Sequence, residues 1–172
     1  MNDIIVIHNV FDFPNEITSL AKSQEFFSLE NHPIDANTKI TWSGKKTLPL
    51  DKILSPTLYE NIINQIINKL PFAVDKKQTV SLFHSFTYAD ISSNKWFHID
   101  NTSFGGVVYI NNVYPSNPDN HGTMILKQNQ EINIPYEYNK LVLYPSNYIH
   151  RPMNGFGKSL DASRLTLNFF IR

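Results

Sequence analysis

Residues 96–100, Trp-Phe-His-Ile-Asp, place a histidine and a carboxylate at a spacing that suits metal binding. The surrounding residues predict the end of a β-strand, in which successive side chains point to opposite faces of the sheet. His98 and Asp100 are therefore expected to share one face. Two such side chains can hold one metal ion if a third ligand comes from elsewhere. The best third candidate is His150, at the end of another strand-like run.

Two histidines and one carboxylate on one side of an ion leave the other coordination positions open, and this arrangement suits non-heme Fe(II) in oxygenases. A further strand-like run at residues 163–171 contains one arginine, Arg164. Its planar guanidinium can clamp a carboxylate through two hydrogen bonds, although an outward-facing arginine in a salt bridge is the simpler reading. Thr166 is expected on the same face, where its hydroxyl could bond the same carboxylate.

The ordered set of His98-x-Asp100, His150 and Arg164, each inside a β-like run, resembles the Fe(II)- and 2-oxoglutarate-dependent oxygenases. The closest similarity is to their prolyl-hydroxylase-like branch, and it covers residues 80–172 best. The resemblance implies that the two histidines and Asp100 bind Fe(II), with O₂ taking an open position. It further implies that Arg164, where that branch often has lysine, holds the distal carboxylate of 2-oxoglutarate together with Thr166.

Four other side chains are secondary candidates. Tyr88 and Tyr109 are possible hydroxyl donors to 2-oxoglutarate, with a place in the core as an equal alternative for each. His121 stands where relatives often carry a glycine-rich turn, and it could be a rival third ligand, as could His84 on its expected strand. A turn histidine at the surface is the simpler interpretation of His121.

The resemblance implies hydroxylation of an amino acid, a peptide or protein side chain, or a small metabolite, with release of succinate and CO₂. Asp100 favours hydroxylation because halogenating relatives lack this carboxylate. A catalytically silent, cupin-like jelly roll that binds metal or ligand is the alternative, and metal-dependent decarboxylation of 2-oxoglutarate separates the two. A cupin-type enzyme without 2-oxoglutarate ranks last, since the expected His-x-His run is absent.

The sequence predicts that these residues are positioned by a mainly β fold with flanking helices, of the α+β class. One helix is expected to begin at Pro14, and another at Ser55-Pro56, with an apolar stripe that ends before Pro71. Short strands with Asn-, Pro- and Gly-rich turns indicate a jelly roll, with the two helices outside the sheet, which agrees with the double-stranded β-helix that the resemblance implies. The expected strands are 3–8, 78–88, 96–100, 104–111, 122–127, 140–144, 148–151 and 163–171, with a short one near 39–42.

The composition further limits which kinds of protein and partner are expected. With 172 residues and 41% hydrophobic side chains, residues 1–172 are expected to form a single globular domain. Fifteen basic and fifteen acidic side chains cancel, which argues against a nucleic-acid partner. No cysteine is present, so thiolate metal sites are excluded. No long apolar stretch predicts secretion or membrane insertion, so we expect a cytoplasmic protein; the oligomeric state cannot be predicted.

Overall fold

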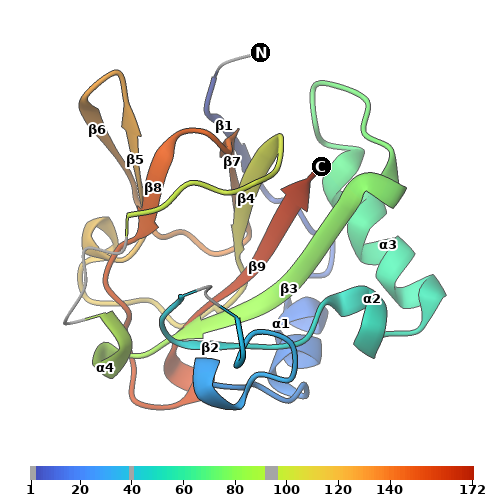
Figure 1. Ribbon diagram of the computed structural model, residues 1–172, viewed down its shortest axis with the longest axis horizontal. Helices are drawn as coiled ribbons and strands as arrows, with labels where there is room; N and C mark the ends of the chain where they lie inside the picture. Colours follow the sequence, from blue (N-terminus) through green and yellow to red (C-terminus); the bar gives the residue numbers. More distant parts are fainter. Residues whose placement is uncertain (1–2, 39–40, 92–96) are drawn as a thin grey trace.

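Nine strands form two antiparallel sheets in a computed structural model that describes residues 3–38, 41–91 and 97–172 (Figure 1). The strands are β1 (Ile5–His8), β2 (Lys45–Lys46), β3 (Thr79–Phe86), β4 (Phe104–Tyr109), β5 (Thr123–Lys127), β6 (Gln130–Ile134), β7 (Lys140–Pro145), β8 (Ile149–Pro152) and β9 (Arg164–Ile171). The larger sheet has the order β1-β7-β4-β9-β3-β2, and the smaller has the order β6-β5-β8. This arrangement confirms the expected jelly-roll class.

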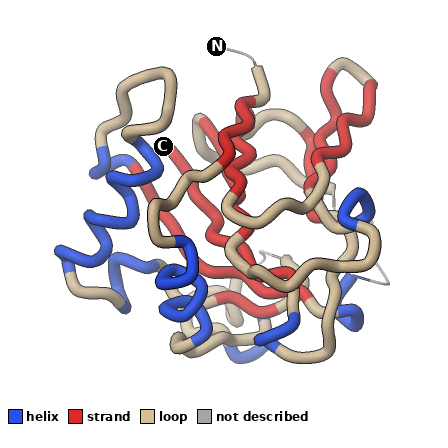
Figure 2. Tube along the Cα trace, turned by 180° about the vertical axis from the view of Figure 1, so that it is seen from behind, coloured by secondary structure: helices blue, strands red, loops and turns tan. Residues whose placement is uncertain are grey.

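Three helices, α1 (Pro14–Lys22), α2 (Leu50–Ile53) and α3 (Pro56–Ile67), lie on one side of the larger sheet, as both overall views show (Figures 1 and 2). The short helix α4 (Tyr88–Ile91) lies apart from them, at the end of β3. Ser55 caps α3 by accepting a hydrogen bond from the Leu58 amide at 3.3 Å, and Pro56 takes the first helical position, as its fixed φ favours. Among the described helices, none is long and apolar enough to cross a membrane.

Two hydrophobic clusters hold the layers together. The first joins the apolar stripe of α3, with Ile62, Ile63 and Ile66 buried, to the outer face of the larger sheet. The second lies between the two sheets and includes Tyr109, Val142 and Tyr144. In β4 and β7 the burial follows the strand period, because alternate residues of these strands enter one cluster or the other.

β9 shows how this alternation creates the site. Leu165 and Leu167 are fully buried in the first cluster, among the helices. Arg164, Thr166 and Asn168 therefore face the space between the sheets, because side chains two residues apart share a face. The expected common face of Arg164 and Thr166 follows directly from this pattern.

Several expected boundaries were wrong. The strand expected at 78–88 ends at Phe86, because the Asp90 carboxylate accepts hydrogen bonds from both the amide and the hydroxyl of Thr87 and starts the short helix α4. Tyr88 is consequently 57% exposed on α4 and not on a strand. The helix α3 stops at Ile67, three residues before Leu70, in a tighter last turn.

Other expected strands agree with the structure only in part. Residues 39–40 and 92–96 lie outside the described residues, and the described Thr41 and Trp42 form no strand; the strand in this region is β2. From 97 to 100, His98 alone forms an isolated bridge, with His150. The unpredicted β6 follows β5 through a turn in which Gln128 and Asn129 have φ of 49° and 64°, a positive-φ hairpin without glycine.

Candidate metal centre

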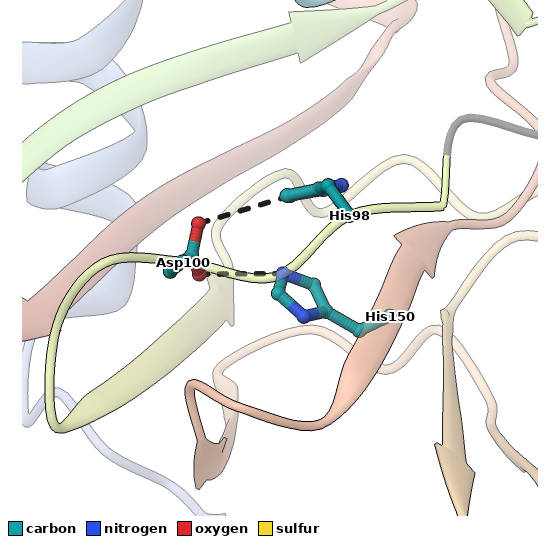
Figure 3. Close-up of side chains that lie close together, drawn as sticks. All are labelled: His98, Asp100 and His150. Carbon is teal, nitrogen blue, oxygen red and sulfur yellow. Dashed lines mark ion pairs between the residues drawn. The ribbon is translucent and has the colours of Figure 1, made fainter.

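Three side chains converge at the rim of the smaller sheet. One ligand atom from each of His98, Asp100 and His150 lies within 4.8 Å of the other two (Figure 3). The backbones of His98 and His150 exchange two hydrogen bonds, of 3.1 and 2.9 Å, which sets the two rings side by side with centroids 4.2 Å apart. Asp100 is fixed by its amide, which donates to the Ser146 carbonyl at 3.0 Å.

The orientation of His150 leaves one ring nitrogen for a ligand. Its Nδ1 lies 2.9 Å from the carbonyl oxygen of Tyr148, so Nδ1 carries the proton and donates it. In the neutral ring the opposite nitrogen, Nε2, is a lone-pair donor, and it faces Oδ2 of Asp100 at 3.3 Å. A hydrogen bond from the other ring nitrogen, as Nδ1 makes here, commonly orients a metal-binding histidine.

Oδ2 of Asp100 is buried and has no hydrogen-bond partner among the described residues. Its 3.3 Å contact with His150 is no hydrogen bond in this tautomer, because two lone pairs face each other. A buried carboxylate oxygen without a partner is costly, whereas a cation between the two atoms would satisfy both. The donor set therefore fits a divalent metal ion.

A cavity of about 470 Å³ opens beside these ligands, between the two sheets. Arg164 lies on its wall and is 1% exposed. Its Nε donates to the carbonyl of His121 at 2.8 Å, and its Nη2 donates to the carbonyl of Gly122 at 2.9 Å. Burial lowers the pKa of Arg164, while the tyrosines Tyr109 and Tyr136 act against that shift. The cavity thus holds a buried guanidinium whose described hydrogen-bond partners are neutral.

Solved structures with the same architecture identify this fold. A prolyl-4-hydroxylase from Pseudomonas putida superposes with a TM-score of 0.63 at 12% identity, covering 100% of this chain and 93% of the other. The chain has the fold of the 2-oxoglutarate- and Fe(II)-dependent oxygenases. No family model matches the sequence, and no curated protein matches it significantly.

Two further structures show how broadly this oxygenase fold is matched. A prolyl hydroxylase from Trichoplax adhaerens, in complex with a peptide fragment of hypoxia inducible factor, has a TM-score of 0.60 at 16% identity, covering 99% of this chain and 84% of the other. HygX from Streptomyces hygroscopicus, with nickel and 2-oxoglutarate bound, has a TM-score of 0.60 at 9% identity, covering 98% and 82%. Identities this low establish the shared fold and leave the activity to be argued from the site.

The hydroxyl side chains expected to contact 2-oxoglutarate occupy different places in the oxygenase fold. The Tyr109 hydroxyl lies 2.8 Å from that of Thr123, and the Tyr109 ring stands 5.3 Å from the Arg164 guanidinium. The Thr166 hydroxyl donates to the carbonyl of His84 at 3.2 Å and lies 2.9 Å from Oδ1 of Asn168. Neither side chain, nor Tyr88, is among the described residues that line the cavity. Their contacts with 2-oxoglutarate remain predictions.

The two rival histidines lie away from the cluster. Nε2 of His84 is 2.7 Å from the Ser43 carbonyl, and burial lowers its pKa well below the usual value, so the ring is neutral. Nδ1 of His121 lies 3.0 Å from the Asn154 carbonyl, on the side of the cavity where Arg164 is held. Within the described ranges, neither joins the group formed by His98, Asp100 and His150.

Tyr144 and Lys46 are among the residues that line the cavity and were not identified from the sequence. Tyr144 is 3% exposed and packs its ring 4.5 Å from that of His150. Burial and the nearby Asp100 raise its pKa well above the ordinary value, so its hydroxyl stays protonated. Lys46 lines the cavity from β2. Tyr144 resembles any core aromatic in sequence, and Lys46 is placed only by the pairing of β2 with β3.

Proposed function

We propose that the protein is an Fe(II)- and 2-oxoglutarate-dependent oxygenase that hydroxylates an amino acid, a peptide or protein side chain, or a small metabolite. The reaction would consume 2-oxoglutarate and O₂ and release succinate and CO₂. The observation that carries the proposal is the buried Oδ2 of Asp100, which faces Nε2 of His150 at 3.3 Å and has no hydrogen-bond partner among the described residues. A divalent cation resolves this contact, and two histidines with one carboxylate leave positions open for the reactants.

In this proposal the metal is held by His98, Asp100 and His150. A bound Fe(II) with 2-oxoglutarate would supply the activation of O₂ and the oxidising power for hydroxylation. The chain's own residues would bind the cosubstrate and orient it in the cavity. Arg164 would anchor the distal carboxylate, because a guanidinium pairs well with a carboxylate in a buried site. The protonated Tyr144 lies beside His150 and can donate a hydrogen bond to an anion in the cavity.

Arg164 would be presented to the cosubstrate by its neighbours. The carbonyls of His121 and Gly122 fix two of its nitrogen atoms, and the rings of Phe86 and Tyr109 stand 5.4 and 5.3 Å from its guanidinium carbon. Gly122 permits this turn, because a Cβ at that position would overlap the Ile134 carbonyl oxygen at 1.7 Å. A side chain held in this way loses little further freedom when it binds an anion.

The structural neighbours support the choice of cosubstrate and leave the substrate class open. HygX is seen with nickel and 2-oxoglutarate, and also with hygromycin B, whereas the Trichoplax enzyme is seen with a peptide. The same fold therefore accepts both small molecules and peptides. The cavity of about 470 Å³ has the size of an ordinary small-molecule site.

Ligand-induced stabilisation and turnover together test the proposal. Protein loaded with Mn(II) should melt higher than metal-free protein, and higher again by about 5–10 °C with 2-oxoglutarate at a hundredfold excess over its Kd. Fe(II)-loaded protein should convert 2-oxoglutarate to succinate. Alanine at His98, Asp100 or His150 should abolish both metal binding and succinate formation, whereas His121→Ala should keep the metal.

Retention of metal by His150→Ala together with its loss in His121→Ala would show that the third ligand was misassigned. Metal binding by wild type without any 2-oxoglutarate increment or succinate would contradict the oxygenase proposal. The catalytically silent jelly roll would then be the better interpretation.

A further inference from the structure

Lys46 brings a second cation into the cavity from the edge of the larger sheet. The two residues of β2 point in opposite directions, with Lys45 exposed and Lys46 half-buried on the cavity wall. Lys46 lies opposite His84 in the pairing of β2 with β3, and its ammonium group stands 4.6 Å from the centre of the Trp42 ring. The ring face supports a cation at this distance.

Among the described residues, cationic side chains outnumber carboxylates on the cavity wall that includes Lys46. Burial lowers its pKa to about 8, and the carboxylates that act against this shift are first Asp35 and then Asp100. His84, its cross-strand neighbour, stays neutral mainly through burial, and the charges of Lys46 and Arg164 lower its pKa further. Among the described residues that line the cavity, three are cationic, Lys46, Arg151 and Arg164, and Asp100 is the single carboxylate.

Metal binding would increase this excess of positive charge, because Asp100 would then be bound to a divalent cation. Asp35, the carboxylate that acts most strongly on Lys46, accepts a hydrogen bond from the indole N–H of Trp42 at 3.0 Å and lies 3.5 Å from Nδ1 of His32. The distal carboxylate of 2-oxoglutarate would pair with Arg164. A positive potential would remain beside Lys46, in the space left for the substrate.

We propose that Lys46 selects the substrate by binding an anionic group, a carboxylate or a phosphate, of a small molecule. The inference rests on the proposed function, because it takes the metal and 2-oxoglutarate as bound. An ammonium group is a compact charge with three donors, so it can meet either anion without a fixed geometry. The substrate is expected to be small because the cavity of about 470 Å³ must also hold the metal and the cosubstrate.

Sulfate is a suitable probe of this subsite, because it presents the shared anion chemistry and forms soluble manganese salts. Protein saturated with Mn(II) and 2-oxoglutarate is melted while sodium sulfate replaces sodium chloride at constant ionic strength. Wild type should show a saturable rise in Tm. Lys46→Met should raise the apparent Kd for sulfate about tenfold or more, and Lys46→Arg should retain most of the binding. Lys45→Met, which removes the same charge one residue away on the exposed side, should behave as wild type.

A wild type without a sulfate-specific shift, or a Lys46→Met variant with the wild-type Kd, overturns the proposal. Loss of the 2-oxoglutarate increment in Lys46→Met overturns it as well, because Lys46 would then belong to the cosubstrate site. The Mn(II) increment of each variant shows that it has folded, and Lys46→Gln replaces Lys46→Met if the latter does not.

Failure of the proposed function gives a different result. Wild type would then show no 2-oxoglutarate increment at all. Sulfate titrated into protein loaded with Mn(II) alone would still report on Lys46, and loss of that shift in Lys46→Met, with retention in Lys45→Met, would support the anion subsite by itself. A shift that survives in Lys46→Met would exclude it.

Discussion

The backbone of Gly105 lies directly against the carboxylate of Asp100. A Cβ atom at position 105 would stand 2.7 Å from Oδ2 of Asp100 and 3.0 Å from Cε2 of Tyr144. Gly105 belongs to β4 and pairs with Tyr144 on β7, so neither backbone can easily move away. The absence of a side chain at this position is what leaves room for the carboxylate beside His150.

Gly105→Ala is expected to push the Asp100 carboxylate out of line with the two histidines. Displacing the support of a metal ligand typically costs 10–100-fold in metal affinity, so the Kd for Mn(II) should rise by about that factor. Titration followed by electron paramagnetic resonance measures it. Gly106→Ala is the matched control: its Cβ would meet Cδ1 of Leu143 at 2.9 Å, which should cost stability and leave the Mn(II) affinity unchanged. Equal affinities for wild type and Gly105→Ala would contradict this account.

Asp100→Asn is expected to stabilise the metal-free protein while it destroys metal binding. The amide nitrogen can donate to Nε2 of His150, and the buried oxygen without a partner is removed. Satisfying this contact should raise the free energy of unfolding by about 1–2 kcal/mol. Denaturant unfolding with and without Mn(II) measures both effects. A metal-free variant less stable than wild type would show that the Asp100 carboxylate is stabilised by something other than a metal.

Arg164→Ala should lose most of the 2-oxoglutarate increment in Tm and keep the Mn(II) increment. It should also unfold more easily by about 1–3 kcal/mol, because the buried His121 carbonyl loses the Nε donor of Arg164 and the Gly122 carbonyl keeps only the Met153 amide among its described donors. Each increment must therefore be measured from the variant's own baseline. Arg164→Lys should recover only part of the 2-oxoglutarate increment, since an ammonium keeps the charge and not the two-pronged geometry. An undiminished increment in the alanine variant would exclude Arg164 as the anchor.

The charge of Lys46 should make its contribution to stability depend on pH. Its pKa is lowered in the folded protein from 10.5 to about 8, so the unfolded chain binds the proton more tightly. Between these values the unfolded state carries more protons, and stability rises with pH. The difference in unfolding free energy, wild type minus Lys46→Met, should therefore increase from pH 8 to pH 10.5 in metal-free protein and stay level below pH 7. The buried tyrosines titrate in both proteins, so their effect cancels. A flat difference across this window would contradict the burial of the charge.

Local rules account for much of what the sequence predicted. The common face of Arg164 and Thr166 follows from the period of the strand β9. His98 and Asp100 are instead placed by backbone hydrogen bonds to His150 and Ser146. The starts of α1 and α3 were visible as proline at a first helical position. The convergence of His150 with His98 was suggested by the family resemblance, because nothing local at either residue encodes the bridge between them.

The features that the sequence did not predict depend mostly on contacts between distant parts of the chain. Lys46 enters the cavity because its two-residue strand pairs with Ser85 and His84, some forty residues further on. Lys45-Lys46 by itself reads as a solvated basic pair. Tyr88 left its expected strand because Asp90 caps the turn at Thr87. β6 was missed because its sequence is largely polar and its hairpin turn uses Gln128-Asn129 in place of glycine.

The bridge between His98 and His150 has a consequence for how the protein opens. Two amide hydrogen bonds join the segment around residue 98 to β8, and the side chains of the same two residues would supply metal ligands in the proposed site. A bound ion would close the long loop of chain between them and reduce the number of partly open states. Hydrogen–deuterium exchange at these two amides should then slow sharply when metal is added. In a chain without cysteine, the ion would take the part that a disulfide plays in secreted domains.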